Sequence, residues 1–150
     1  MNASSVEADF DRLALLDEEG WTANNHYHHF LLKHVPRDCE NALEVGCGTG
    51  AFARCLAERC KHVVALDLSS EMIRVARSRS SQFHNLNFEL ADAMTWNFPQ
   101  SHFDFICSIA TLHHLEQREL FVKMKEAGLH SCRTAIICCI RLPGVVPLAM

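Results

Sequence analysis

The sequence predicts an α/β sandwich: a mainly parallel sheet of about five strands with helices on both faces and a shortened carboxyl-terminal end. Two observations lead to this fold class. Short apolar runs alternate with segments of helical periodicity from residue 41 onward, and the first run passes into a helix through a turn of alternate glycines. Strands that alternate with helices form parallel sheets, because each helix carries the chain back to the same end of the sheet.

The composition is that of one globular domain. The chain has 150 residues, of which 49% are hydrophobic and 21% charged, and its net charge is −4. This charge argues against the broad basic face of a nucleic-acid-binding protein, and no apolar run approaches the roughly 20 residues of a membrane span. No signal peptide is recognisable, so we expect a cytoplasmic protein with reduced thiols. None of the eight cysteines shows Cys-x-x-Cys spacing, so no metal site is expected.

The stretch Asn41–Gly50 is the centre of the prediction. It begins as the end of a buried strand, and glycines then follow at alternate positions 46, 48 and 50. Alternate glycines leave bare backbone on one side of a turn, so a ligand can lie against it and the chain can adopt positive φ. Phe52, Cys55 and Leu56 next have the spacing of an amphipathic helix. Strand, glycine turn and helix in this order open a nucleotide-binding βαβ unit.

The rest of the chain is expected to continue this alternation. The further predicted strands are His62–Asp67, Leu86–Leu90, Phe103–Ile109 and Ala135–Ile140. Ser69 is expected to cap the helix after the second strand. The inward stripe of that helix is predicted to be Met72, Val75 and Ala76. A helix over about residues 116–127 is expected to pair Glu119 with Lys123 on its surface. Its predicted inward stripe is Leu120, Phe121 and Met124.

Two helical segments are expected before the glycine turn. Residues 5–19 have the apolar spacing of an amphipathic helix, and Phe30–Val35 reads as a helix that Pro36 stops. Between them, Trp21–His29 gathers aromatic and imidazole side chains.

Polar residues follow the carboxyl ends of the predicted strands, where parallel sheets bind their ligands. Glu44 precedes the glycines, Asp67 ends the second strand, Asp92 follows the third, and Ser108 leads toward His113 and His114. A carboxylate at position 67 can accept hydrogen bonds from vicinal ribose hydroxyls, and one at position 92 from the exocyclic amine of a base.

Two classes of cofactor fit this outline. A dinucleotide requires the spacing G-x-G-x-x-G/A, which Gly46, Gly48 and Ala51 supply. S-adenosylmethionine instead requires an acidic group close to its ammonium, and Glu44 suits that demand.

The motifs together resemble those of class I S-adenosylmethionine-dependent methyltransferases, which have a Rossmann-like three-layer sandwich. The pattern Glu44-x-Gly46-x-Gly48-x-Gly50 is similar to the first motif of that family. The acidic residue that holds the ribose there corresponds to Asp67, and the pair beside the adenine to Asp92-Ala93. Phe103 through His114 resembles the fourth-strand motif that runs into the substrate side of the cleft.

The resemblance implies a methyl transfer from S-adenosylmethionine to a small-molecule acceptor. The cofactor-binding residues that we predict are Glu44, Gly46, Cys47, Gly48, Gly50, Asp67, Leu68, Asp92, Ala93 and Ser108. His113 is the first candidate for a general base, with His26 or His28 behind it.

The resemblance also divides the chain into a helical lid, residues 1–36, and a methyltransferase domain, residues 37–150. The last strands of the family have no sequence left to form them, so the apolar tail that contains Ile136 and Ile137 is expected to lie on an open edge and to promote self-association. Two alternatives stay open: an inactive relative that only binds the cofactor, and a nicotinamide-dependent oxidoreductase.

Overall fold

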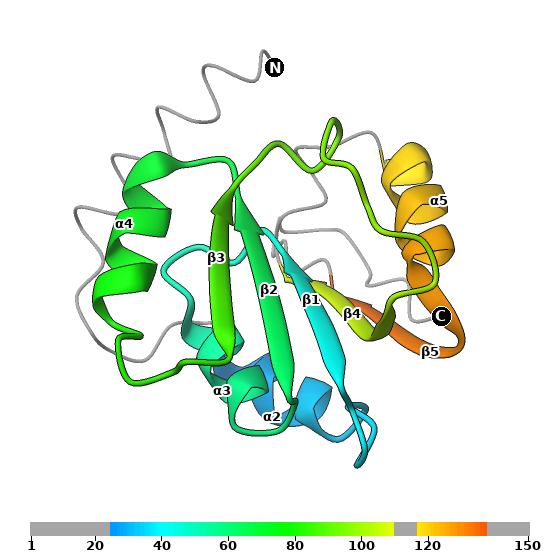
Figure 1. Cartoon of the computed structure of the whole chain (residues 1–150), viewed down its shortest axis with the longest axis horizontal. Coiled ribbons are helices and arrows are strands. Elements are labelled where there is room, and N and C mark those ends of the chain that lie inside the picture. The colour runs from blue at the N-terminus through cyan, green and yellow to red at the C-terminus, as the bar shows by residue number, and fades with distance from the viewer. Residues whose placement is uncertain (1–24, 110–116, 138–150) are drawn as a thin grey trace, which may run out of the picture.

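A computed structural model describes residues 25–109 and 117–137. It contains one five-stranded sheet of order β3-β2-β1-β4-β5, in which all neighbouring strands are parallel (Figure 1). The strands are β1 (Asn41–Val45), β2 (His62–Asp67), β3 (Leu86–Leu90), β4 (Phe103–Ile109) and β5 (Gly128–Ile137). The strand order reverses between β1 and β4, and the predicted fold class is confirmed.

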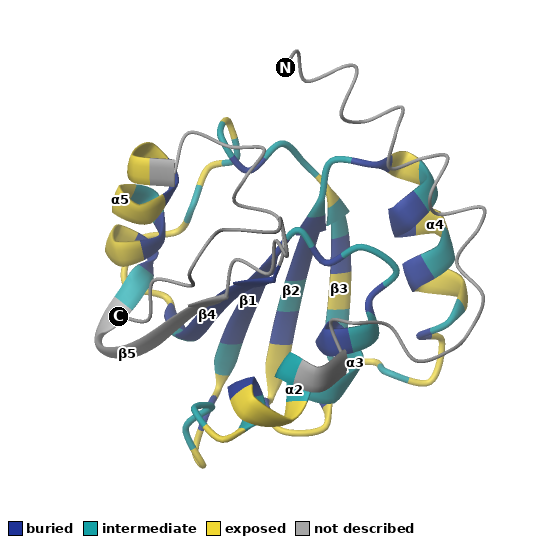
Figure 2. Ribbon diagram, turned by 180° about the vertical axis from the view of Figure 1, so that it is seen from behind, coloured by how far each residue is buried: buried dark blue, intermediate teal, exposed yellow. Residues whose placement is uncertain are grey.

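Helices lie on both faces of the sheet. They are α2 (Asn25–Leu32), α3 (Ala51–Ala57), α4 (Ser70–Ser78) and α5 (Gln117–Ala127). Figure 2 shows α2 and α3 in front of the buried central strands, and α4 follows on the same face. α5 covers the opposite face, where Leu120 and Met124 pack with Leu43 and Ile106.

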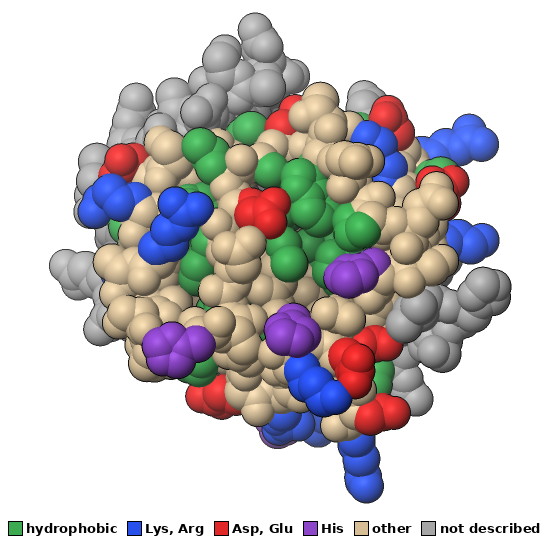
Figure 3. Space-filling model, viewed as in Figure 1, with side chains coloured by type: hydrophobic (Ala, Val, Ile, Leu, Met, Phe, Trp, Pro, Cys, Tyr) green, Lys and Arg blue, Asp and Glu red, His purple; other side chains and the backbone are tan. Residues whose placement is uncertain are grey.

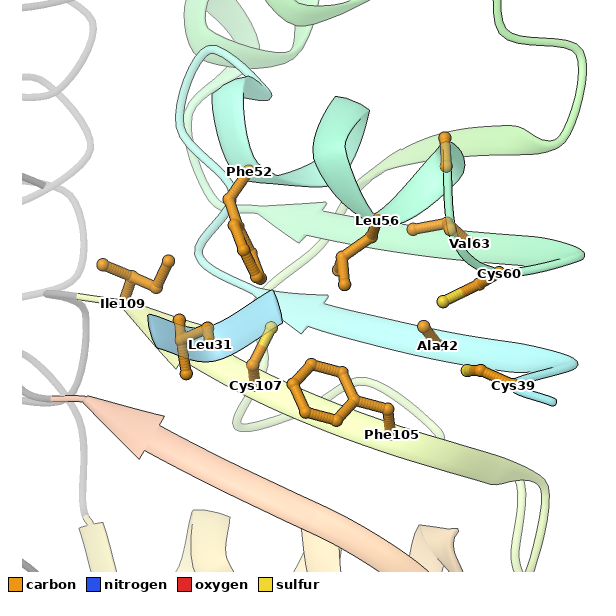
Figure 4. Close-up of a cluster of buried hydrophobic side chains, with 11 residues drawn as sticks. Leu31, Cys39, Ala42, Phe52, Leu56, Cys60, Val63, Phe105, Cys107 and Ile109 are labelled. Atoms are coloured by element: carbon orange, nitrogen blue, oxygen red, sulfur yellow. The ribbon is translucent and has the colours of Figure 1, made fainter. Parts of the chain in front are cut away.

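The first face holds a core in which side chains of two helices meet three strands. Phe52 and Leu56 of α3 and Leu31 of α2 lie over Phe105 and Val63 of the sheet (Figure 4). Cys39, Cys60 and Cys107 fill the gaps as small apolar groups, as expected of cysteines in periodic segments.

Two element boundaries differ from the prediction. The prediction began the helix at Phe30, whereas α2 spans Asn25–Leu32, so the histidines at positions 26, 28 and 29 are helical, and it ends at Leu32 rather than Val35. β5 begins at Gly128, directly after α5, and not at Ala135. The sequence prediction relied on the apolar run alone, whereas the edge of β4 pairs with the chain as soon as α5 ends.

Two inward stripes also needed correction. In α5 the side chain of Phe121 is 37% exposed, because it lies one residue off the buried positions Leu120 and Met124. In α4 Ile73 is buried, while Val75 is only half-buried. The cap by Ser69 is confirmed: its hydroxyl accepts a hydrogen bond from the Met72 amide at 3.1 Å.

Some predicted features lie outside the described residues: the helix over residues 5–19, most of the lid segment, and the tail beyond Ile137. Within the described residues β5 pairs only with β4 and forms an edge of the sheet. Self-association through this edge stays a prediction. In the part of the chain that the structure describes, no helix is long and apolar enough to cross a membrane.

At Gly50 the start of α3 packs closely against residues of β3 and α4. It is the N-cap of α3 with φ +78°, and a Cβ atom there would lie 2.7 Å from the Phe88 ring and 3.2 Å from the Cβ of Ala76. No side chain larger than hydrogen fits without moving the Phe88 ring and crowding Ala76 of α4. Gly48 also has positive φ, +53°, but among the described residues a Cβ there would meet only the Met72 sulfur, at 4.0 Å.

We expect Gly50→Ala to lower the free energy of unfolding by about 2–5 kcal/mol, because left-handed strain and overpacking act together. The matched variant Gly48→Ala carries only the backbone strain and should lose about 1–2 kcal/mol. Urea unfolding measures both. Equal losses would show that the contact with Phe88 does not determine the glycine at position 50.

Candidate cofactor site

The glycine turn is held against the carboxyl end of β2 by main-chain hydrogen bonds. The amides of Gly46 and Cys47 both donate to the Leu66 carbonyl, at 2.8 and 2.9 Å. Gly46, Gly48 and Gly50 have φ angles of +77°, +53° and +78°, in the left-handed region that favours glycine. The spacing of the three glycines therefore reflects three backbone conformations as well as the absence of side chains.

Asp67 connects the glycine turn to the start of α4. One carboxylate oxygen, Oδ2, accepts a hydrogen bond from the Gly48 amide at 2.7 Å, and Oδ1 accepts one from the Ser69 amide at 2.9 Å. Its carbonyl also accepts from the Ala91 amide at 2.9 Å, which draws the end of β3 to the same place. The predicted ribose-binding residue thus also determines the shape of the turn.

Glu44 is buried beneath the turn, on the face of the sheet that α3 covers. Its side chain is 2% exposed, and Ala53, in the first turn of α3, donates a backbone hydrogen bond to its carboxylate. Among the described residues its Oε2 has no hydrogen-bond partner. The carboxyl group therefore does cap a helix, but only one of its two oxygens is satisfied by doing so.

Burial raises the pKa of Glu44 well above its ordinary value, and the nearby charge of Asp67 raises it further. The guanidinium of Arg54 acts in the opposite sense. Burial likewise raises the pKa of the Cys47 thiol, with contributions from both carboxylates. Two acids that face one another in a poorly solvated place create a local demand for a cation.

Arg54 is a site residue that the sequence analysis missed. Its guanidinium donates to the Thr49 carbonyl at 3.0 Å and lies 3.4 Å from the Ser80 hydroxyl, so it braces the glycine turn from α3. It also faces Glu44 and His28 closely enough to shift the pKa of each. The sequence feature that could have identified it is an arginine one helical turn after the last glycine of the turn, downstream of an acid in the preceding strand.

Asp92 and its neighbours lie at the end of β3. The Asp92 carboxylate accepts from the Met94 amide at 2.8 Å, and its carbonyl accepts from the amides of Thr95 and Trp96. Ala93 is buried, and Leu68 is half-buried in the turn between β2 and α4. The geometry places these residues beside Asp67, and their contact with an adenine stays a prediction.

Ser108 lies at the end of β4, opposite Val45 of β1. Side chains alternate along a strand, so Ser108 points to the face that α5 covers, whereas Glu44 and Cys107 point to the face of α3. The Ser108 hydroxyl is buried and has no hydrogen-bond partner among the described residues. Its contact with the cofactor stays a prediction.

The histidine candidates are placed unequally. His28 packs its ring against Phe52, with centroids 5.0 Å apart, and burial lowers its pKa, helped by the positive charge of Arg54. His28 is therefore neutral at pH 7. His26 belongs to α2, and His113 lies outside the described residues. No group of three or more His, Cys, Asp or Glu in the described ranges could hold a metal ion.

Comparison with known proteins gives a family. A family profile described as a methyltransferase domain matches residues 42–128, more than half of the chain. The chain belongs to the methyltransferase-domain family. The match confirms the class I resemblance drawn from the motifs. The matched range includes the glycine turn, β2 and β4.

Among curated relatives, an uncharacterised methyltransferase of Mycobacterium tuberculosis is 37% identical over 99 residues, which are 66% of this chain and 50% of that protein. The chain thus spans about half the length of such relatives.

Among solved structures, the N-methyltransferase NodS of Bradyrhizobium japonicum, in complex with S-adenosylhomocysteine, superimposes with a TM-score of 0.76 at 23% identity, over 87% of this chain and 71% of NodS. Phosphoethanolamine N-methyltransferase 2 of Haemonchus contortus, in complex with phosphomonomethylethanolamine and S-adenosylhomocysteine, gives 0.68 at 25% identity, over 78% of this chain and 28% of that one.

The raised pKa of Glu44 predicts a pH dependence of stability. The native state holds the proton more tightly than the unfolded state, so stability falls as the pH rises from about 4.5, the ordinary value, up to the raised native value. In Glu44→Gln this fall should be absent, and the variant should gain on the wild type by up to about 1.4 kcal/mol per pH unit within that window. Urea unfolding between pH 4 and pH 8 tests this.

The matched control is Glu58→Gln, which changes an exposed carboxylate just after α3 and should keep the wild-type pH profile. Parallel profiles for the wild type and Glu44→Gln would show that the native carboxyl is ionised at its ordinary pKa.

Proposed function

We propose that the chain is an S-adenosylmethionine-dependent methyltransferase that acts on a small-molecule acceptor. The observation that carries the proposal is the glycine turn itself. It presents bare backbone at Gly48, where an added Cβ would meet no described atom other than the Met72 sulfur. Beneath it lies a buried acid with one oxygen unsatisfied among the same residues. A ligand with a nucleoside and a cationic amino-acid end matches both features.

In this proposal the residues at the ends of β1, β2 and β3 bind different parts of the ligand. The buried Glu44 carboxyl, with its raised pKa, and its neighbour Asp67 form the pole for an ammonium group, because a bound cation favours the ionised form of Glu44 that burial disfavours. We assign Asp67 and Leu68 to the ribose, and Asp92 and Ala93, which follow β3, to the adenine. The main chain at Gly48 allows close approach of the ligand. The complexes of NodS and of the Haemonchus enzyme with S-adenosylhomocysteine support this assignment.

S-adenosylmethionine, when bound, supplies a methyl group already activated on a sulfonium. The protein must therefore orient an acceptor atom, exclude water and, where the acceptor carries a proton, remove it. His113 follows β4 in the chain and is our candidate for the proton acceptor. His28 is neutral at pH 7 and stands second, since its ring is engaged with Phe52.

A small molecule is the acceptor class that we favour. Figure 3 shows Lys and Arg side chains scattered among acidic ones on the viewed face, without the basic stripe of a nucleic-acid-binding surface. The Haemonchus enzyme, whose complex contains phosphomonomethylethanolamine, supports the same class. A cytoplasmic location fits this proposal.

The dinucleotide alternative is disfavoured by the way α3 packs. In the dinucleotide pattern the third small residue permits close contact between helix and strand, and here that position would be Ala51. In this structure Gly50 makes the close contact, with Phe88 and Ala76. The spacing that fits the structure is therefore the one with three alternate glycines.

Isothermal titration with S-adenosylhomocysteine tests the cofactor. We expect saturable one-to-one binding to the wild type and an affinity roughly ten-fold or more lower for Asp67→Ala, since the variant loses an acceptor for Gly48 and for the ligand together. Glu58→Gln serves as the control and should bind as the wild type does. Binding of NADH without binding of S-adenosylhomocysteine would contradict the proposal.

Transfer from labelled S-adenosylmethionine to a pool of small-molecule acceptors tests the enzyme. We expect His113→Gln to slow transfer by about 10²–10⁴-fold while the affinity for S-adenosylhomocysteine stays within about two-fold. His34→Gln, on an exposed histidine-to-carbonyl hydrogen bond, is the matched control and should leave the rate unchanged. Binding without transfer to any acceptor would support the inactive relative instead.

A further inference from the structure

Two cysteines lie opposite one another at the amino-terminal ends of β1 and β2, far along the strands from the glycine turn. The register pairs Asn41 with His62, and counting back two residues brings Cys39 opposite Cys60. Main-chain hydrogen bonds extend this pairing beyond the strands: the Lys61 amide donates to the Cys39 carbonyl at 3.2 Å, and the His62 amide donates to the Glu40 carbonyl at 2.7 Å. Neighbouring strands are about 5 Å apart, within the range of Cα separations that a disulfide spans.

The side chains of the two cysteines meet. Both side chains point into the same core cluster (Figure 4). A hydrogen-bond interaction between the two thiols shifts the pKa of each, and the Cys39 thiol also contacts the Asn41 carbonyl at 3.8 Å. Cys107 belongs to the same cluster but lies further along, at the position on β4 that pairs with Glu44. Among the cysteines that the structure describes, Cys60 is therefore the suitable partner within reach of Cys39, and the backbone already holds the two in register.

The two thiols differ in acidity. The hydrogen bond from Cys39 lowers the pKa of Cys60, with help from the charge of Arg59, and the same hydrogen bond raises the pKa of Cys39. The negative charges of Asp104 and Asp38 raise the latter further. Cys60 is therefore the sulfur suited to attack first, and once it is part of a mixed disulfide it no longer carries the charge that helps to raise the pKa of Cys39.

The pair lies just beneath the surface. Cys39 is 2% and Cys60 is 5% exposed, but the residues on either side of each one are exposed: Asp38 and Glu40, and Arg59 and Lys61. Cys60 follows the end of α3 between exposed residues, so a local opening there would suffice to bring its sulfur to solvent, away from the site at the other end of the strands.

We propose that Cys39 and Cys60 are a site of covalent modification, a dithiol that low-molecular-weight disulfides convert into an internal disulfide across the base of β1 and β2. The Cys60 thiolate attacks one sulfur of the small disulfide and releases one thiol. The Cys39 sulfur, after losing its proton to water, attacks the mixed disulfide and releases the second thiol. The two cysteines lose two electrons and two protons, and the small disulfide is reduced to two thiols.

The disulfide would close a loop that contains β1, the glycine turn and α3. Because the bond restricts the unfolded chain more than the folded one, it should raise the melting temperature by about 5–10 °C. The cofactor site lies at the carboxyl ends of the strands, so the affinity for S-adenosylhomocysteine should change less than two-fold. The proposal does not rest on the methyltransferase assignment.

The test uses the whole chain, equilibrated with oxidised glutathione under native conditions and then alkylated. Non-reducing digestion with trypsin, and with a glutamate-specific protease that cuts between Cys39 and Cys47, identifies the linked peptides. We expect one intramolecular link, Cys39 to Cys60, with the rise in melting temperature abolished by dithiothreitol.

The variants Cys39→Ala and Cys60→Ala should each lose the link and the thermal shift. Cys55→Ala changes a half-buried cysteine of α3 whose thiol contacts the Ala51 carbonyl, and it should keep both. A link from Cys60 to Cys107, a stable mixed disulfide with glutathione, or no link at all in the wild type would each overturn the proposal.

Discussion

The carboxylate of Asp67 is the interaction on which the rest of the site depends. One of its oxygens accepts from the amide of Gly48 and the other from the amide of Ser69, so it joins the glycine turn to the start of α4. Gly48 and Asp67 are 19 residues apart in the sequence. The amide of Gly48 is available for this bond only because three glycines allow the turn its left-handed angles. A short acidic side chain at the end of β2 therefore determines both the shape of the turn and the charge beside it.

That arrangement places the Glu44 carboxyl where its environment disfavours ionisation. Glu44 is fully enclosed, Asp67 faces it, and Arg54 is the cation that offsets their charge among the groups that shift the pKa of Glu44. A protein selected for stability alone has no evident need of a second carboxylate here, since a neutral side chain could accept the hydrogen bond of Ala53. A bound cationic ligand would offset the cost of ionising the buried Glu44 carboxyl. This is the physical reason for the function that we propose.

The sequence predicted the parts that depend on local patterns. Alternation of apolar runs located β1 to β4 with the observed bounds, and the alternate glycines identified the turn. It failed where tertiary contacts decide. β5 starts at Gly128 because β4 offers an edge, and Phe121 is exposed because a three-residue stripe cannot be positioned on a helix without knowing its partner. Arg54 was missed since its role comes from neighbours in space, Thr49, Ser80 and Glu44, and not from a motif.

The central claim is that the bare backbone at Gly48, with Glu44 beneath it, receives the sulfur-bearing nucleoside. A crystal structure of the chain with S-adenosylhomocysteine tests it most directly. The account predicts the ligand against Gly46–Gly50, with its ammonium on the side of Glu44 and its ribose at Asp67. A ligand bound elsewhere, or a turn closed by protein side chains with those carboxylates directed away from the ligand, would contradict it.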